Sequence, residues 1–219
     1  MVARVGAGFD RWLWGPDGRP RRGRFSLAVA GFYLLFAATY LPINAFSVGR
    51  RAHILYLPGE ERLPFLPIFE YLYVLTYFMP VLLIFSIGDY SRYQRLVRAF
   101  LITLAAAYTT YLLYPVWFER PNLVVDSLHT WLLSIEYLDG SYNNLPSLHV
   151  SLSWLAVHAA QVSGRVRGGL AVVAIGISVS TIFVKQHYIV DVLSGFTIAW
   201  IAWAMARGGS PKSPGEAAI

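Results

Sequence analysis

The sequence predicts an all-α membrane protein: a bundle of six transmembrane helices, with a short interfacial helix between spans three and four. Composition, the lengths of the apolar stretches and the distribution of basic residues support this fold class. Of the 219 residues, 56% are hydrophobic and 14% are charged. A soluble domain carries about 25% charged residues. Lipid is therefore the expected solvent for most of the surface.

Six apolar stretches are long enough, or nearly so, to cross a hydrocarbon core about 30 Å thick. They lie at roughly 25–48, 63–88, 99–118, 147–163, 168–184 and 187–206, and the fourth is short. A seventh stretch at 124–138 is apolar but contains Asp126, His129 and Glu136. These charges favour a helix lying in the membrane interface over another span. An ordinary extracytoplasmic loop is the alternative.

No repeat, low-complexity tract or domain linker divides the chain, which favours one domain. We expect a basic cytoplasmic head at 1–24, a six-span catalytic domain at 25–207 and a short cytoplasmic tail at 208–219. The head contains six arginines. The apolar run that follows it is too long for a signal-peptide core, so it is interpreted as the first span.

Basic residues indicate the orientation, because cytoplasmic loops of membrane proteins are enriched in Lys and Arg. With the N-terminus inside, 13 of the 18 basic residues fall on the cytoplasmic side and 5 on the other. Both termini are then cytoplasmic, and a bacterial plasma membrane is the expected location. The net charge of +6 fits contact with anionic lipid and not nucleic acid. The absence of cysteine excludes disulfides and thiolate metal sites.

The string Pro146-Ser147-Leu148-His149 is the first candidate for chemistry. Proline suits the first turn of a helix, so a helix is expected to start here. The free backbone N–H groups of that turn, at Ser147 and Leu148, could bind a phosphate. His149 would then lie beside the phosphate. A hydrogen-bonded structural histidine at the interface is the alternative.

His187 and Asp191 are four residues apart at the start of the sixth stretch. On a helix they would share one face and touch. A carboxylate that accepts one imidazole N–H leaves the other ring nitrogen basic, as a nucleophile or general base needs. A structural ion pair of Asp191 with Lys185 is the alternative.

Arg120, just after the third stretch, could bind phosphate through two N–H groups, or it could face lipid headgroups. With the orientation above, Arg120, His149 and His187 all lie at the extracytoplasmic ends of their spans. This convergence predicts an extracytoplasmic active site.

These residues resemble the motifs of the type 2 phosphatidic acid phosphatase superfamily of membrane lipid phosphatases. Its motifs are a Lys six residues before Arg-Pro, then Pro-Ser-x-His, then Ser-Arg-x5-His-x3-Asp. The second motif is intact, the third has Thr in place of Arg, and the first keeps only Arg-Pro. The matching residues are Arg120, Pro121, Pro146, Ser147, His149, Ser180, His187 and Asp191. The resemblance covers roughly 114–195 and implies a membrane enzyme that hydrolyses a lipid phosphate.

Two cations of the superfamily are replaced, by Leu113 in the first motif and Thr181 in the third. This is similar to the branch that contains inositol phosphorylceramide synthase, in which a Ser-Thr pair opens the third motif. Members of that branch transfer a lipid headgroup to an alcohol instead of water. A headgroup transferase is therefore the alternative enzyme. A membrane transporter with a proton relay through His187 and Asp191 is the alternative of another class.

The resemblance implies a double displacement. His187, oriented by Asp191, attacks phosphorus, and His149 protonates the departing oxygen and then activates the acceptor. We expect four polar residues to bind the phosphate, and two others to bind the acceptor or support the site. The phosphate-binding candidates are Arg120, Ser147, Lys185 and Ser180, and the others are Glu70 and Asn144. No carboxylate cluster accompanies these residues, so we expect neither metal nor cofactor. The expected partners are the lipid phosphate substrate and membrane lipids, and the sequence leaves the oligomeric state open.

Overall fold

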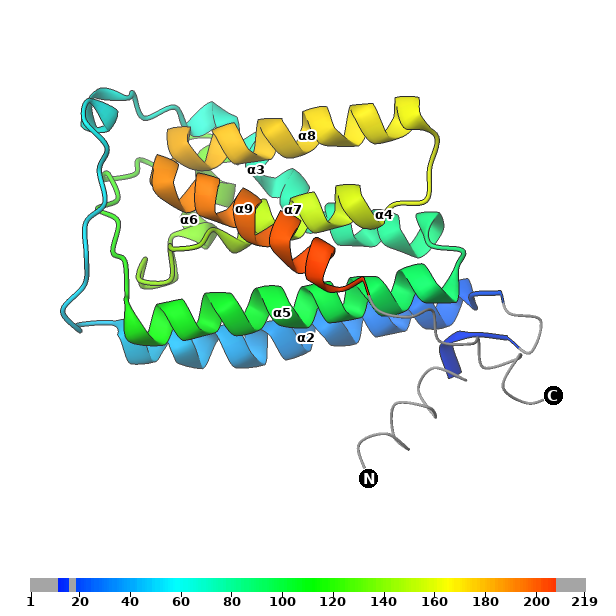
Figure 1. Cartoon of the computed structure of the whole chain (residues 1–219). Coiled ribbons are helices and arrows are strands. Elements are labelled where there is room, and N and C mark those ends of the chain that lie inside the picture. Colours follow the sequence, from blue (N-terminus) through cyan, green and yellow to red (C-terminus); the bar gives the residue numbers. More distant parts are fainter. Residues whose placement is uncertain (1–11, 16–18, 208–219) are drawn as a thin grey trace.

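The computed structural model describes residues 12–15 and 19–207. In this part of the chain all regular structure is helical, and β-pairing is limited to isolated bridges. Figure 1 shows the helices running along one common direction. The α-helices are α2 (Arg22–Ser47), α3 (Glu70–Tyr73), α4 (Met79–Ser86), α5 (Tyr90–Leu113), α6 (Leu128–Glu136), α7 (Leu148–Ala159), α8 (Gly164–Phe183) and α9 (Ile189–Met205). The 3-10 helices are η1 (Glu60–Arg62), η2 (Pro67–Phe69) and η3 (Val74–Tyr77).

Four helical segments of the described residues are long and apolar enough to cross a membrane. They are α2, the broken segment Pro67–Ser86, α5 and α8. Large apolar side chains remain exposed on their outer faces, including Leu34 at 73%, Leu101 at 59% and Val172 at 69%. Such a surface is unusual in a soluble protein. It fits an integral membrane protein.

The fourth and sixth predicted spans correspond to shorter helices. α7 has 12 residues and α9 has 17, which at 1.5 Å per residue gives about 18 Å and 26 Å. Both are apolar, but neither reaches the length of the other four segments. Their crossing of the membrane, and with it the six-span count, stays a prediction.

The helix that contains the third predicted span, α5, begins at Tyr90, before that stretch, and ends at Leu113, before residue 118. The carboxylate of Asp89 caps the helix by accepting the N–H of Ser91. Arg92, Arg95 and Arg98 therefore lie in the first turns of α5. Long arginine side chains can lie along a helix while their charged ends reach polar groups.

α7 lies at the centre of the bundle and packs against α9, α5, α8 and α4. Its start is close to α9, because a Cβ on Gly195 would lie 2.6 Å from the backbone oxygen of Ser147. Only glycine allows this approach. The hydroxyl of Ser151 adds a hydrogen bond of 3.0 Å to the carbonyl of Gly195. The close approach brings the starts of α7 and α9 together, where the predicted catalytic residues lie.

The structure has a helix, α6, within the stretch 124–138, opened by a reciprocal capping box between Ser127 and Thr130. Its location at a membrane interface stays a prediction. At the N-terminus, Trp14 is buried and packs on Phe25, and α2 starts at Arg22, inside the expected head. Arg4, Arg11 and the tail 208–219 lie outside the described residues.

Candidate active site

The two motif histidines are in contact. His149 is the second residue of α7, and His187 lies in the turn between α8 and α9. The distance from His149 Nδ1 to His187 Nε2 is 3.2 Å. His187 is 4% exposed. Residues 38 positions apart thus form one pair of imidazoles, in which His187 is buried and His149 is half-buried.

Asp191 lies next to His187, at the ring nitrogen that does not contact His149. Its Oδ2 lies 3.4 Å from His187 Nδ1 and accepts the backbone N–H of Tyr188 at 2.9 Å. The expectation that both residues share a helix was wrong, because α9 starts at Ile189 and only Asp191 is helical. The turn before α9 still brings His187 to the carboxylate. Asp191 is fully buried, and the N–H of Tyr188 holds its carboxylate in place.

Pro146 precedes α7 and does not open it. Ser147 is the capping residue, with its Oγ accepting the N–H of Val150 at 3.4 Å. The N–H of Ser147 donates to the carbonyl of Asp191 at 3.0 Å. That N–H therefore joins the second and third motifs. The expectation that it is free to bind a phosphate was wrong. At the start of α7, Leu148 and His149 carry the first-turn N–H groups that lack an intrahelical acceptor.

Tyr73, which the sequence did not single out, contacts His149 from the second apolar segment. Its hydroxyl lies 2.8 Å from His149 Nε2, and Tyr73 is fully buried. Nearby, the Thr76 hydroxyl donates to the carbonyl of His149 at 3.2 Å. No motif or spacing marks Tyr73 among the 14 tyrosines. Only tertiary packing, in which η3 contacts α7 directly after α3, reveals it.

Arg120 is held by protein groups at the same end of the bundle. Its Nη2 donates to Asp139 Oδ1 at 2.5 Å and to Gln186 Oε1 at 2.6 Å. Its guanidinium lies over the Tyr137 ring, 4.7 Å from the centroid. Its Nε has no hydrogen-bond partner in the described part of the chain. Asp139 and Gln186, the residue before His187, therefore fix the orientation of the Arg120 guanidinium.

Three polar side chains within the third motif donate hydrogen bonds to backbone carbonyls. Lys185, with a left-handed φ of 58°, donates from Nζ to the carbonyl of Leu63 at 2.8 Å. Burial lowers the pKa of the Lys185 ammonium, which Glu60 opposes. The hydroxyls of Ser180 and Thr181 donate to the carbonyls of Ile177 and Ser178 in their own helix. Phosphate binding by Lys185 and Ser180 stays a prediction.

The two residues expected near an acceptor differ in their surroundings. Glu70 is fully buried, and neither carboxylate oxygen has a partner among the described residues. Asn144 instead fastens a loop, because its Nδ2 donates to the carbonyls of Val116 and Ser141 at 2.9 and 2.8 Å. Their predicted roles are untested, but Glu70 keeps free acceptor atoms and Asn144 has used its donors.

A carboxylate outside the motifs supports the start of α9. Glu60 is 4% exposed, and its Oε1 accepts the N–H of Ile189 at 2.6 Å. Its Oε2 accepts the N–H of Leu57 at 2.9 Å. Acidic groups stabilise helix N-termini. The distance of 129 positions between the partners hides this contact from sequence patterns.

Comparison with models of known protein families shows which family the chain belongs to. A family model described as PAP2 superfamily matches residues 62–205, about two thirds of the chain. The chain belongs to the PAP2 superfamily. Its members are phosphatases or phosphotransferases, which supports phosphoryl transfer in general. The matched region of this PAP2 protein contains Glu70, Arg120 and all three motif residues His149, His187 and Asp191. No curated protein and no solved structure matches the chain.

Proposed function

We propose that this PAP2 protein is an integral membrane phosphatase that hydrolyses a lipid-linked phosphate through a phosphohistidine on His187. The observation that carries the proposal is one contact: His149 Nδ1 lies 3.2 Å from His187 Nε2. With Asp191 behind His187 at 3.4 Å, the site contains a nucleophile, its orienting carboxylate and an acid–base partner.

The nucleophile in this mechanism is His187 Nε2. Asp191 favours the proton on Nδ1, which leaves the lone pair on Nε2. Attack forms the P–N bond and breaks the bond between phosphorus and the lipid oxygen. The Tyr188 N–H holds the Asp191 carboxylate beside Nδ1, where it favours this tautomer in both steps.

His149 acts as the acid and then the base. When a phosphate enters between the two rings, protonated His149 gives its proton to the departing lipid oxygen. Neutral His149 then takes a proton from water, whose oxygen attacks phosphorus and releases phosphate and His187. General acid–base catalysis contributes roughly 10²–10⁴-fold. The hydroxyl of Tyr73, 2.8 Å from Nε2, fixes the ring orientation.

Charge stabilisation comes from groups around the pair. Phosphoryl transfer depends mainly on positioning and on stabilising the charge of the phosphoryl oxygens. Arg120 is the motif cation that this chain keeps, and the first-turn N–H groups of Leu148 and His149 add donors. In this proposal Lys185 contributes its charge from the turn that carries His187. Ser147 and Ser180 shape the site through backbone contacts.

A headgroup transferase is the second candidate function. Two positions that carry cations in the superfamily motifs hold Leu113, which is 78% exposed, and Thr181, which is fully buried. The free carboxylate oxygens of Glu70 could accept a hydrogen bond from an alcohol acceptor. These features favour an alcohol as the attacking group. They are similar to the expectation for the inositol phosphorylceramide synthase branch.

Product analysis separates these functions. The purified protein is incubated with phosphatidic acid, phosphatidylglycerol phosphate, a polyprenyl diphosphate and a phosphosphingolipid, with and without an alcohol-bearing lipid. Hydrolysis gives free phosphate, and transfer gives a new phospholipid. His187→Ala serves as the control and should give neither. Failure of the wild-type protein to produce either product from any lipid would contradict the proposal. The membrane transporter with a proton relay would then be the next hypothesis to test.

A further inference from the structure

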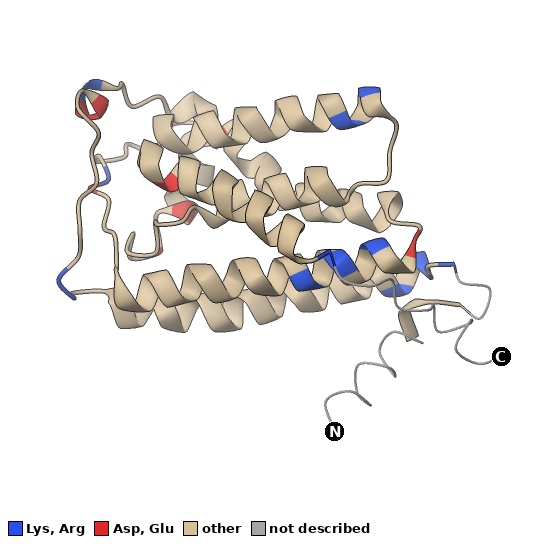
Figure 2. Cartoon of the chain, viewed as in Figure 1, with Lys and Arg blue, Asp and Glu red and all other residues tan. Residues whose placement is uncertain are grey.

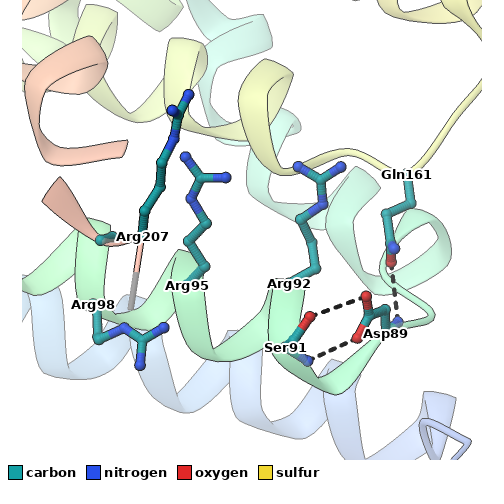
Figure 3. Close-up of a pocket in the computed structure, with 8 residues that line it drawn as sticks. Asp89, Ser91, Arg92, Arg95, Arg98, Gln161 and Arg207 are labelled. Atoms are coloured by element: carbon teal, nitrogen blue, oxygen red, sulfur yellow. Dashed lines mark hydrogen bonds between the residues drawn. The ribbon is translucent and has the colours of Figure 1, made fainter. Parts of the chain in front are cut away.

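A cavity of about 350 Å³ opens at the opposite ends of α7 and α9 from the histidines. Figure 3 shows it beside the first turns of α5. Its lining includes Arg92, Arg95, Arg98, Arg207, Asp89 and Gln161. We call this cavity the arginine pocket. Figure 2 shows basic residues gathered along the first turns of α5, near the end of α9, whereas an acidic residue lies near the start of α9.

The pocket follows from unequal helix lengths. α5 has 24 residues, whereas α7 and α9 have 12 and 17. The last carbonyls of the two short helices therefore meet side chains of α5. Arg92 donates to the carbonyl of His158 at 3.2 Å, and Arg95 donates to that of Trp203 at 2.7 Å. Arg95 also lies over the Trp203 ring, 3.9 Å from its centroid. These contacts fix the two guanidinium groups.

The positive charge of the pocket has no matching negative charge in the described part of the chain. Four guanidinium groups meet one carboxylate, and Asp89 already accepts the N–H and the hydroxyl of Ser91 at 2.8 and 3.1 Å. None of the four arginines forms an ion pair with a described residue. Arg98 Nε is buried without a partner. Each guanidinium has five N–H donors, so many donors remain free.

We propose that the arginine pocket binds the phosphate group of an anionic ligand, at a second site distinct from the histidine pair. In Figure 3, Arg92, Arg95 and Arg207 point the same way, toward the ends of α7 and α9, and Arg98 points toward α2. Guanidinium groups match phosphate oxygens with paired hydrogen bonds. A ligand with two or three negative charges would balance the pocket.

Gln161 gives the pocket a neutral donor. Its Oε1 accepts the N–H groups of Gly88 and Asp89 at 2.7 and 3.0 Å. These bonds fix the amide, and its NH₂ group has no acceptor in the described chain. A phosphate oxygen can supply that acceptor. The same chemistry is offered by a phosphomonoester lipid headgroup and by a soluble phosphate compound.

The test compares two double variants of the full-length protein. Arg92→Gln/Arg207→Gln removes two pocket cations. Arg51→Gln/Arg165→Gln is the control: both arginines are exposed, lie outside the pocket and give the same change in net charge. The melting temperature is measured in phosphatidylcholine nanodiscs with and without phosphatidic acid. It is also measured in neutral detergent with and without pyrophosphate.

We expect phosphatidic acid, pyrophosphate or both to raise the melting temperature of the wild type and the control equally, and that of the pocket variant by less than half as much. A rise with phosphatidic acid alone identifies a lipid headgroup, and a rise with pyrophosphate alone identifies a soluble ligand. Binding at the histidine pair would raise all three proteins equally. That result, or no rise at all, overturns the proposal.

If the double variant fails to fold, Arg207→Gln is measured against Arg165→Gln under the same conditions. Arg207 donates no side-chain hydrogen bond to a described residue, so its loss leaves no helix carbonyl unpaired. A smaller rise for Arg207→Gln supports the site, and an equal rise overturns it. Lipid hydrolysis is not the readout, so failure of the proposed function would not affect this result.

Discussion

At the scale of single residues, the two histidines differ in the group that contacts the ring nitrogen not shared between them. His187 has Asp191 at 3.4 Å from Nδ1, and His149 has the Tyr73 hydroxyl at 2.8 Å from Nε2. A carboxylate strengthens a nucleophilic imidazole. A neutral hydroxyl orients a ring without favouring its charged form. The structure therefore supports His187 as the proposed nucleophile and His149 as the proposed acid–base group.

The histidines should fail in different ways when replaced by Ala. With an aryl phosphate, whose leaving group is good, His149→Ala should release one equivalent of phenol and then stall, because the second step needs a base. His187→Ala should release none. Asp191→Asn should slow the first step, because the imidazole adopts the wrong tautomer. Rapid-quench measurement of the burst checks all three. A burst from His187→Ala with none from His149→Ala would reverse the assignment.

Tyr73→Phe should lower kcat roughly 2- to 12-fold with little change in KM, since a neutral hydrogen bond contributes about 0.5–1.5 kcal/mol. It should also shift the limb of the pH–kcat profile that reports His149. Tyr108→Phe is the control, because its hydroxyl bonds Thr39 at 2.9 Å on the outer helices. Equal effects of the two variants on kcat would show that Tyr73 has only a structural role.

At the scale of elements, the approach of α7 to α9 assembles the site. Sequence patterns predicted His149, His187 and Asp191, because each motif is local. They could not predict Tyr73, Glu60 or Asp139, whose contacts join distant segments. They also missed the first turns of α5, because apolar patterning does not mark a turn whose arginines bond the ends of α7 and α9. Tertiary packing supplies what local patterns lack.

Gly195→Ala should destabilise the protein by about 1–3 kcal/mol, the usual cost of overpacking, and should reduce activity. Its Cβ would meet the Ser147 oxygen at 2.6 Å and the Val150 Cβ at 3.1 Å, and neither can easily move. Gly176→Ala is the matched control, since its nearest contact, with Leu72, is an ordinary 3.8 Å. Thermal unfolding in detergent gives both values. Equal unfolding midpoints for the two variants would show that the α7–α9 approach tolerates a side chain.

At the scale of the whole molecule, the proposed catalytic site and the arginine pocket lie at opposite ends of α7 and α9. This separation agrees with the orientation inferred from the basic residues, with the histidines outside and the arginines of α5 inside. α7 and α9 are shorter than the four long segments. Arg92 and Arg95 bond the ends of these helices, which shows how short helices can fit among long ones.

The active site should face away from the cytoplasm. Single cysteines at Asn122 and Gly164 are probed in intact cells with a thiol reagent that does not cross membranes, and the protein has no native cysteine to interfere. Asn122→Cys should react, and Gly164→Cys should react only after the membrane is permeabilised. The reverse pattern would mean an inverted topology and cytoplasmic access for the substrate.

The most direct test of the account is to trap the covalent intermediate. His149→Ala is mixed with an aryl phosphate carrying a radiolabelled phosphate, because its good leaving group departs without the acid, and the protein is quenched in alkali and digested. The labelled peptide is identified by mass spectrometry. The account predicts an acid-labile, alkali-stable phosphate on His187, and no label in the His149→Ala/His187→Ala double variant. Label on another residue, or free phosphate released by a protein that lacks His187, would contradict it.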